Sequence, residues 1–224
     1  MNLTVVTPWL DCPELMQKYW QALEAGLDSD DRAIIIDNGS NPAILASYRD
    51  RFATEPPSWA TFERWPLNYG FSVACNAGLA RVGTEAVLFL NNDVRMNDAR
   101  WLERIKEKIA PGALVGLQLR SDPHTAVDGL LVPYLDGWCL AGMTEEIRSL
   151  GGWDEEYEEP SYYGDNDLCA RAVSRGMQLV IAEAGLRHLS NYTSKRMKIN
   201  EVSAHNRTRY EQRVRDLRAS LVNA

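Results

Sequence analysis

The chain has 224 residues, of which 45% are hydrophobic and 25% charged, and its formal net charge is −7. This composition is typical of a folded globular protein with room for one sizeable α/β domain, and it excludes a disordered chain. The acidic balance argues against a general affinity for nucleic acid.

No apolar run approaches the roughly 18 to 20 residues that cross a bilayer, and the first residues lack the basic and long apolar segments of an export signal. We therefore expect a cytoplasmic protein. The cysteines stand far apart without a Cys-x-x-Cys pair, which favours buried free thiols over a zinc site, a redox pair or disulfides. They are Cys12, Cys75, Cys139 and Cys169.

The first half of the chain alternates apolar runs typical of buried strands with segments of helical spacing. The predicted elements are strand 3–7 ended by Pro8, helix 13–27, strand 33–36, helix 42–51, edge strand 59–64, helix 70–82 and strand 87–90. This order predicts an α/β fold with a mostly parallel sheet and helices on both faces.

The second half is less regular. Its predicted elements are helix 99–109, strand 113–119, strand 130–140 interrupted by Pro133, helix 142–150, helix 165–175, strand 179–182 and helix 198–221. Without a linker, repeat or low-complexity segment, we expect a single domain over residues 1–224. It divides into a nucleotide-binding type of half (1–95), a more irregular half (96–190) and a C-terminal basic helix (195–222).

Polar residues follow three of the predicted strands, at Thr7-Pro8, 37–40 and 91–93. Because the carboxyl ends of parallel strands line one crevice, we expect these groups to converge on a site. Asp93 follows four apolar residues and is a candidate cation ligand, although a turn that caps the strand is the alternative. No Gly-x-Gly-x-x-Gly or Gly-Lys-Ser/Thr motif is present, so a bound diphosphate would need a metal.

Seven segments, in family order over nearly the whole chain, resemble those of family 2 glycosyltransferases of the GT-A fold. They are residues 5–8 (Val-Val-Thr-Pro), 36–40 (Ile-Asp-Asn-Gly-Ser), 68–78 (Asn-Tyr-Gly-Phe-Ser-Val-Ala-Cys-Asn-Ala-Gly), 88–94 (Leu-Phe-Leu-Asn-Asn-Asp-Val), 150–155 (Leu-Gly-Gly-Trp-Asp-Glu), 164–171 (Gly-Asp-Asn-Asp-Leu-Cys-Ala-Arg) and His188. The chain looks most similar to the branch that includes rhamnosyltransferase-like enzymes of cell-surface polysaccharide assembly.

The resemblance implies a nucleotide-sugar site in the first half. Asp37 would hydrogen-bond the nucleoside, and Thr7 and Pro8 would shape the base pocket. Asn68 and Asn76 would lie near the nucleotide and its phosphates, where helix N-terminal N–H groups favour anions. An ordinary Asx turn at Asp37 and a simple helix cap at Asn68 are the alternatives.

The resemblance also implies a metal site. Asp93 matches the last carboxylate of the family's Asp-x-Asp motif, which binds Mg²⁺ or Mn²⁺ at the donor diphosphate. Asn91 replaces the first aspartate, and it and Asn92 would face the donor; an amide oxygen or a water can serve there. His188 resembles the late histidine that completes the site and would favour Mn²⁺. A structural role is the alternative for a lone histidine.

The general base is implied by residues 164–167, which resemble the family's Glu-Asp-x-Asp motif. Asp165 occupies the base position, and Gly164 replaces the preceding acid. The alternative is that Asp165 and Asp167 stabilise a helix N-terminus, an effect of about 0.3 to 1 kcal/mol each. Asp167 would then support Arg171 or the fold.

The acceptor side is implied by aromatic and acidic residues. Trp153, Asp154 and Glu155 are candidates for an acceptor wall, since aromatic rings stack on sugars and carboxylates accept their hydroxyl hydrogen bonds. A solvated acidic loop is the alternative. Trp138 would lie under the donor sugar.

The segment from Lys195 to Arg218 contains eight basic residues and three acidic ones. Such a helix can attract anionic lipids, which would place the protein peripherally at the inner face of a membrane. Its low apolar content favours a solvated helix instead. That helix would be packed through Met197, Val202, Tyr210, Val214 and Leu217.

Together these features predict an inverting, metal-dependent hexosyltransferase. The donor would be a UDP, dTDP or GDP sugar and the acceptor a glycan or lipid-linked hydroxyl, with residues 96–190 as the acceptor and catalytic half. A non-catalytic nucleotide-sugar or glycan-binding module is one alternative. A sugar-nucleotide pyrophosphorylase is another, although its Gly-rich, Lys/Arg-bearing loop after the first strand is missing.

Overall fold

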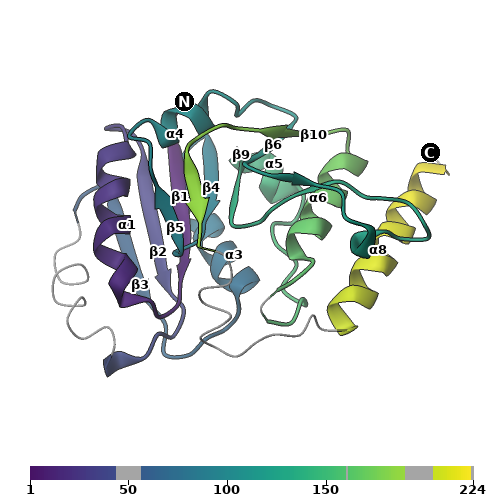
Figure 1. Cartoon of the computed structure of the whole chain (residues 1–224), viewed down its shortest axis with the longest axis horizontal. Coiled ribbons are helices and arrows are strands. Elements are labelled where there is room, and N and C mark those ends of the chain that lie inside the picture. Colours follow the sequence, from purple (N-terminus) through teal and green to yellow (C-terminus); the bar gives the residue numbers. More distant parts are fainter. Residues whose placement is uncertain (44–56, 160, 190–203, 223–224) are drawn as a thin grey trace.

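This computed structural model of the protein describes residues 1–43, 57–159, 161–189 and 204–222. A seven-stranded sheet runs through it in the order β10-β6-β9-β4-β1-β2-β3 (Figure 1). Its strands are β1 (Leu3–Trp9), β2 (Arg32–Asp37), β3 (Ala60–Arg64), β4 (Ala86–Leu90), β6 (Ala113–Gly116), β9 (Cys139–Met143) and β10 (Gln178–Ile181). Among these described strands only β9 is antiparallel to its neighbours, which are β4 and β6. The predicted mostly parallel α/β sheet is confirmed.

Two small sheets lie outside the central one. β5 (Val94–Met96) pairs with β11 (Leu186–His188), and β7 (Leu119–Arg120) pairs with β8 (Tyr134–Leu135). The described helices are α1 (Pro13–Gly26), α3 (Phe71–Arg81), α4 (Trp101–Lys106), α5 (Thr144–Ser149), α6 (Gly164–Ser174), α8 (Ala204–Val222) and a 3₁₀ turn at Pro123–Thr125. None of these helices is both long and apolar enough to cross a membrane.

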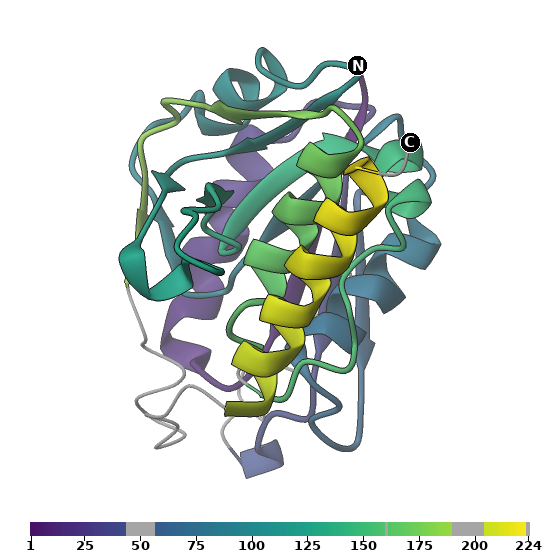
Figure 2. The same ribbon diagram turned by 90° about the vertical axis from the view of Figure 1, so that its right-hand side faces the viewer.

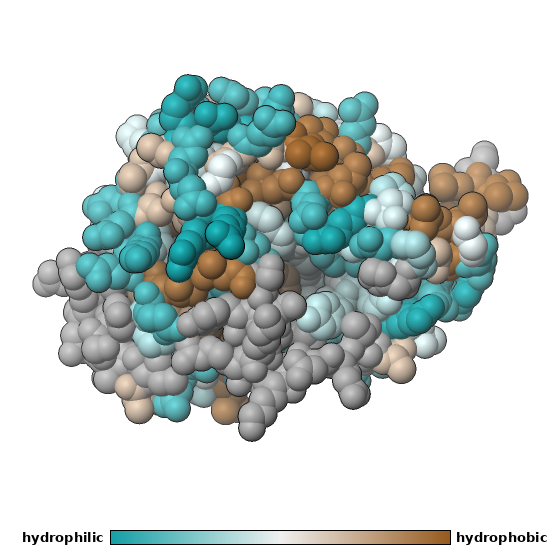
Figure 3. Space-filling view, viewed as in Figure 1, coloured by the Kyte–Doolittle hydropathy of each residue, from teal (hydrophilic) through white to brown (hydrophobic). Residues whose placement is uncertain are grey.

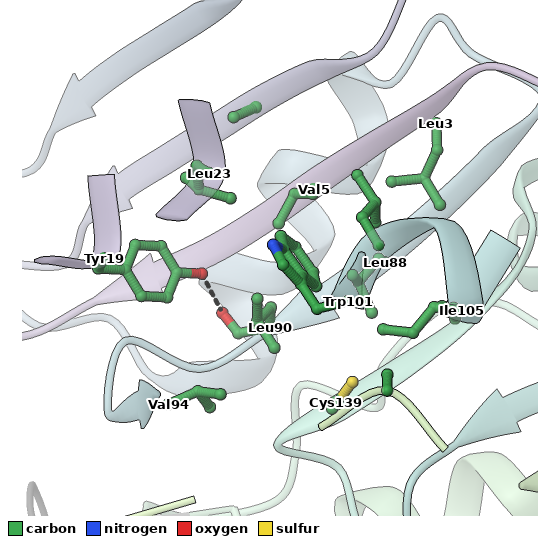
Figure 4. Packing of buried hydrophobic residues seen from close by; sticks show 14 of the residues in the cluster. Leu3, Val5, Tyr19, Leu23, Leu88, Leu90, Val94, Trp101, Ile105 and Cys139 are labelled. Carbon is green, nitrogen blue, oxygen red and sulfur yellow. Dashed lines mark hydrogen bonds between the residues drawn. The ribbon is translucent and has the colours of Figure 1, made fainter. Parts of the chain in front are cut away.

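The central sheet is buried on both faces, because alternate residues of its strands point to opposite sides. On one face Leu3 and Val5 pack with α1 and α4, and the hydroxyl of Tyr19 donates to the carbonyl of Leu90 over 3.3 Å (Figure 4). On the other face Val6 packs with α3, α5 and α6. The long apolar runs in the sequence therefore reflect burial on two sides.

Helix α8 lies outside this layer and packs along α6 (Figure 2). Tyr210 and Val214 are buried there, and the ring of Tyr210 stacks on Tyr163 with centroids 5.2 Å apart. The predicted C-terminal helix and its packing through Tyr210, Val214 and Leu217 are confirmed. Met197 and Val202 lie outside the described residues.

One predicted strand, over residues 130–140, is wrong. β8 ends at Leu135 and β9 begins at Cys139, because the intervening turn bonds elsewhere. The Asp136 amide donates to the carbonyl of Gln118, and the Gly137 amide donates to the carboxylate of Asp165. The turn thereby carries the chain from the small β7–β8 sheet into the central sheet.

Other boundaries shift by smaller amounts. β1 continues through Pro8 to Trp9. Proline has no N–H to donate to a neighbouring strand, but no such bond is lost here, because the pairing of β1 with β4 already ends at Val6. The predicted strand 113–119 is divided into β6 and β7. The predicted helix 142–150 is shorter in the structure, where α5 spans Thr144–Ser149. Most of the predicted helix 42–51 lies outside the described residues. The four cysteines are buried and free, as predicted.

Candidate active site

The ends of β1, β2 and β4 meet at one edge of the sheet, as the sequence predicts. The Asn38 amide donates to the carbonyl of Trp9 over 2.7 Å, which joins the ends of β2 and β1. The Nδ2 of Asn92 donates to the carbonyl of Leu10 over 3.1 Å, which joins the loop after β4 to the same point. Residues more than eighty positions apart in the sequence thus form one rim.

Asp37 is the buried carboxylate of this rim and is fully enclosed. Its Oδ1 accepts from the amide of Ser40 over 3.0 Å, so the Asx turn considered for this segment is present. Its Oδ2 lies 3.5 Å from Nε of Arg64 and has no hydrogen-bond partner among the described residues. Burial raises the pKa of Asp37 above its ordinary value, while Ser40 and Arg64 oppose that rise. One carboxylate oxygen is left to accept from a ligand.

Asn38 and Asn68 hold the loop that precedes α3. Oδ1 of Asn68 accepts from Nδ2 of Asn38 over 2.8 Å and from the amide of Gly70 over 2.9 Å. Oδ1 of Asn38 in turn accepts from the amide of Tyr69. The side chain of Asn68 therefore orders the loop at the rim. The N-cap of α3 is Gly70, which makes no side-chain cap bond, so these contacts differ from the helix cap considered as the alternative.

Asn76 bonds to the protein through both ends of its side-chain amide. Its Oδ1 accepts from the amide of Trp153, and its Nδ2 donates to the carbonyl of Trp153 and to Oε1 of Glu155. The side-chain amide is therefore fully engaged in fastening the loop at residues 151–155 onto α3. Its predicted place near the nucleotide and its phosphates stays a prediction, while its described contacts are structural.

Thr7 and Trp153 are both buried in the core. The hydroxyl of Thr7 bonds that of Tyr19 over 2.6 Å, on the α1 face of the sheet. The ring of Trp153 is 2% exposed and packs edge-on with Phe71 and Phe89. The described contacts of both side chains are with the protein, and their predicted roles in the base pocket and the acceptor wall stay predictions.

Pro8 and Asn92 both lie at the rim, Pro8 as part of β1 and Asn92 through its side-chain amide. Pro8 is buried in β1 at the position paired with Ile36. Asn92 is buried, and its Nδ2 is engaged with Leu10. Both residues keep their predicted location at the edge of the sheet, while their described contacts are with the protein.

Asp93 and His188 meet, although they are 95 residues apart in sequence. His188 Nε2 lies 3.0 Å from Oδ1 of Asp93, and the amide of Leu189 donates to the Asp93 carbonyl over 2.9 Å. The β5–β11 pairing, in which His188 is opposite Val94, brings them together. The imidazole of His188 stacks on the indole of Trp138, with centroids 5.1 Å apart and planes within 4°.

These residues fit a divalent cation. Two ligands at neighbouring corners of an octahedron with bonds of about 2.1 Å lie about 3.0 Å apart, which matches the Asp93–His188 separation. Oδ1 of Asn91, in the same loop, is buried without a hydrogen-bond partner among the described residues. No cluster of three or more His, Cys, Asp or Glu side chains suited to a metal occurs in the described part of the chain. A cation held here would therefore need further oxygen ligands from its substrate or from water.

Asp165 stands at the start of α6 and faces the same turn as Trp138. Its Oδ2 accepts from the amide of Gly137 over 2.9 Å, and its Oδ1 accepts from the amide of Asn166. Burial raises the pKa of Asp165 to about 6; the Gly137 N–H opposes the rise, and the charge of Asp136 adds to it. A carboxylate with this pKa can accept a proton near neutral pH.

The turn at residues 136–138 joins the two halves of the site. Gly137 contacts Asp165, and the next residue, Trp138, contacts His188 and accepts at its carbonyl from the amide of Asn91. A Cβ built on Gly137 would lie 2.9 Å from Cβ of Asp165, so a side chain there would displace the carboxylate. The sequence interpretation missed Asp136 and its partner Arg120; the Asp-Gly pair within an apolar run was the available signal of a turn.

Asp154 points away from this site. Its carboxylate is paired with Arg209 and Arg213 of α8. Burial opposes the charged form, but the N–H of Glu156 and these two arginines keep the pKa of Asp154 below its ordinary value. Glu155 remains exposed and accepts from Asn76. Of the acidic acceptor candidates, only Glu155 therefore keeps a solvent-facing carboxylate.

The N-terminus of α3 binds the carboxylate of Glu159. The amide of Phe71 donates to Oε1 of Glu159 over 2.5 Å, and the same oxygen accepts from the hydroxyl of Ser161. An acceptor for the first N–H groups of a helix is expected on electrostatic grounds. The anion-binding role considered for this helix start is filled by Glu159 in this structure.

The arginines of α8 are neutralised by nearby acids. Each lies within 4.0 Å of a carboxylate; they are Arg207, Arg209, Arg213, Arg215 and Arg218. The end of the helix exposes Leu221 and Val222. Figure 3 shows hydrophobic surface at the C-terminal tip of the molecule, on its right-hand side. The described part of α8 therefore offers little free positive charge. Lys195, Arg196 and Lys198 lie outside the described residues.

Comparison with known proteins relates this site to a family. The family described as Glycosyl transferase family 2 matches residues 4–133, which is more than half of the chain. No curated protein sequence matches.

Two solved structures share the fold. One is a mannosyltransferase, PcManGT from Pyrobaculum calidifontis, in complex with GDP-Man and Mn²⁺: TM-score 0.64, 14% identity, covering 99% of this chain and 75% of that one. The other is GalNAc-T7 with UDP, GalNAc and Mn²⁺: TM-score 0.69, 13% identity, covering 96% of this chain and 48% of that one. This chain thus spans about half the length of the second structure.

Proposed function

Because the chain belongs to glycosyl transferase family 2 and has the GT-A fold, we propose that it transfers a sugar from a nucleoside-diphosphate sugar to an acceptor hydroxyl, with inversion and with Mn²⁺ or Mg²⁺. One observation carries the proposal. Gly137 contacts the Asp165 carboxylate, and the next residue, Trp138, contacts His188 of the Asp93–His188 pair. A donor diphosphate at the pair and an attacking hydroxyl at Asp165 could therefore meet at this turn.

Asp93 and His188 would hold the cation, and Oδ1 of Asn91, in the same loop as Asp93, would be a third ligand. The cation would supply the positive charge that stabilises the departing diphosphate. The complexes of GDP-Man and of UDP with Mn²⁺ in two proteins of the same fold support this assignment.

Asp165 would act as the general base. In an inverting transfer the acceptor oxygen attacks the anomeric carbon on the face opposite the leaving diphosphate, and its proton must be removed as the bond forms. The raised pKa of Asp165, about 6, matches this task because the group is ionised yet basic at neutral pH. The N–H of Gly137 would keep one carboxylate oxygen in place while the other takes the proton.

Asp37 would bind the nucleoside through its Oδ2, which is ion-paired with Arg64 and accepts no hydrogen bond from the described residues. We take UDP, dTDP and GDP sugars as donor classes. Trp138 would lie beside the donor sugar, and Glu155 would meet the acceptor, which we take to be a glycan or lipid-linked hydroxyl. The proposal includes three finer predictions. The donor carries a hexose, the role is rhamnosyltransferase-like in surface polysaccharide assembly, and the protein is cytoplasmic with peripheral membrane contact.

Turnover tests the proposal. The protein is incubated with UDP, GDP and dTDP sugars, with and without Mn²⁺, and release of nucleoside diphosphate is measured. We expect Mn²⁺-dependent release with one donor class, loss of release in Asp165→Ala, and retained Mn²⁺-dependent nucleotide binding in that variant by calorimetry. Binding without release in the native protein would identify a non-catalytic binding module, and pyrophosphate-dependent formation of a nucleoside triphosphate would identify a pyrophosphorylase.

A further inference from the structure

Two contacts with described residues hold the imidazole of His188: a hydrogen bond between its Nε2 and Oδ1 of Asp93, and the stack on Trp138. Its Nε2 faces Asp93, but none of the described residues hydrogen-bonds its Nδ1. Histidines that bind metals are ordinarily oriented by an acceptor on the second ring nitrogen. In the described part of the chain, the Trp138 indole stacks parallel to the imidazole and orients the ring in place of such an acceptor.

Trp138 is itself held at two points, and its partner Asp136 is held at two more. Its carbonyl accepts from the amide of Asn91 over 2.9 Å, and its indole N–H donates to Oδ2 of Asp136 over 3.4 Å. The other oxygen of Asp136 accepts from Nε of Arg120 over 2.6 Å, and the Asp136 amide donates to the carbonyl of Gln118. The plane of the indole is therefore defined before any ligand binds.

We propose that Trp138 is a positioning residue: its indole, fixed through Asp136 and Arg120, holds the imidazole of His188 with Nε2 toward Asp93. The proposal rests on the cation site of the proposed function. Without the stack, rotation of the imidazole would move Nε2 away from Asp93 and separate the two protein ligands. An aromatic side chain at position 138 is therefore required, and a bulky aliphatic one is insufficient.

The experiment compares Trp138→Leu, which removes the aromatic face, with Trp138→Phe, which retains one. Trp59→Leu is the matched control, because it also removes a partly buried tryptophan that contacts another aromatic ring, that of Trp20, at 4.9 Å between centroids and with planes tilted by 39°. Trp59 immediately precedes the edge strand β3. Free Mn²⁺ is measured by electron paramagnetic resonance in the presence of nucleoside diphosphate. Outer-shell partners of metal ligands commonly contribute about 10- to 100-fold to affinity. We expect at least a tenfold weaker Mn²⁺ affinity in Trp138→Leu, and values within about threefold of the native protein in Trp138→Phe and Trp59→Leu.

A second measurement needs no metal. In the metal-free protein, ring current from the stacked indole should shift the imidazole C–H protons of His188 upfield, with the signals assigned by their loss in His188→Gln. The shift should disappear in Trp138→Leu and persist in Trp59→Leu.

Two outcomes would overturn the proposal: unchanged Mn²⁺ affinity in a folded Trp138→Leu variant, or the absence of a ring-current shift in the native protein. Failure of the native protein to bind Mn²⁺ or to release nucleoside diphosphate would instead count against the proposed function. The ring-current measurement would still report on the stack in that case.

Discussion

Asp165 combines two requirements that oppose each other. Its burial at the turn favours the neutral acid, while the N–H groups of Gly137 and Asn166 favour the carboxylate. The balance leaves a pKa of about 6, between those of an ordinary aspartate and a histidine. This is the range in which one side chain can be both ionised and a useful base at neutral pH.

The raised pKa of Asp165 predicts the pH dependence of the reaction. Since the base acts when ionised, kcat/KM should fall about tenfold for each pH unit below about 6 and level off above it. A pH–rate profile checks this, and Asp165→Asn should show no such limb. An unchanged acid limb in that variant would assign the base elsewhere.

The same group affects stability with a definite sign. Its pKa is 3.8 when unperturbed and about 6 when folded, so the folded state binds more protons between these values. The contribution of Asp165 to stability therefore falls as pH rises through this window. Asp165→Asn should gain stability relative to the native protein between pH 4 and pH 7, as measured by urea unfolding at both pH values.

Two glycines near Asp165 make a matched pair. A Cβ on Gly164 would meet its nearest neighbour at 3.7 Å, an ordinary contact, whereas one on Gly137 would meet Asp165 at 2.9 Å and Trp153 at 3.0 Å. Gly164→Ala should therefore stabilise the protein by about 0.4 to 1 kcal/mol through the unfolded chain, with activity retained.

Gly137→Ala should lower kcat at least tenfold, because displacement of the base by a fraction of an ångström misaligns proton transfer. Urea unfolding and initial rates separate the two effects. Equal activities in Gly137→Ala and the native protein would contradict the described position of Asp165.

At the scale of elements, α8 is fastened to α6 by both apolar and charged contacts. Tyr163 and Tyr210 stack, and Arg213 bridges Asp154 and the fully buried Asp167. Asp167 is also paired with Arg171 of its own helix. The helix that begins with the proposed base is therefore held by a long C-terminal helix on its outer side (Figure 2).

This arrangement predicts unequal effects for two arginines of α8. Arg213→Gln removes a charged donor from buried carboxylates and should cost about 1.5 to 3 kcal/mol. Arg215→Gln removes an exposed pair with Asp128 and should cost at most about 1 kcal/mol. Urea denaturation measures both, and equal losses would show that α8 is held mainly by its apolar contacts.

At the scale of the whole molecule, ligands should stabilise the folded state through the rim and the cation site together. A ligand at one hundred times its dissociation constant adds about 2.7 kcal/mol. For a chain of this size that corresponds to a rise in Tm of about 5 to 10 °C. We expect this rise with a nucleoside diphosphate plus Mn²⁺ at saturating concentrations, and little change with Mn²⁺ alone, because few protein ligands face the cation.

Asp93→Ala is the variant that tests this site. It should abolish the Mn²⁺-dependent part of the rise in Tm while leaving the fold intact by circular dichroism. Chelation of the metal should have the same effect on the native protein. A full Mn²⁺-dependent rise in Asp93→Ala would show that the cation is held elsewhere.

Much of the fold was predictable because its signals are local. The buried runs that became β2 and β4, and the apolar spacing that became α1, reflect periodicity within a few residues. The small β5–β11 sheet was missed, since each of its strands has three residues and its pairing joins distant segments. The turn at 136–138 was taken as strand for the same reason: its bonding partners lie far away in the chain.

The sequence alone determined the class of fold, the family resemblance and the residue types at each strand end, because these depend on composition and order. The tertiary structure decided which of those residues share a site. It joined His188 to Asp93 and Gly137 to Asp165, and it placed Thr7, Asn76 and Trp153 in structural contacts. The physical reason is that burial and hydrogen bonding depend on the direction in which each side chain leaves its packed element, and that direction follows from contacts between segments tens of residues apart.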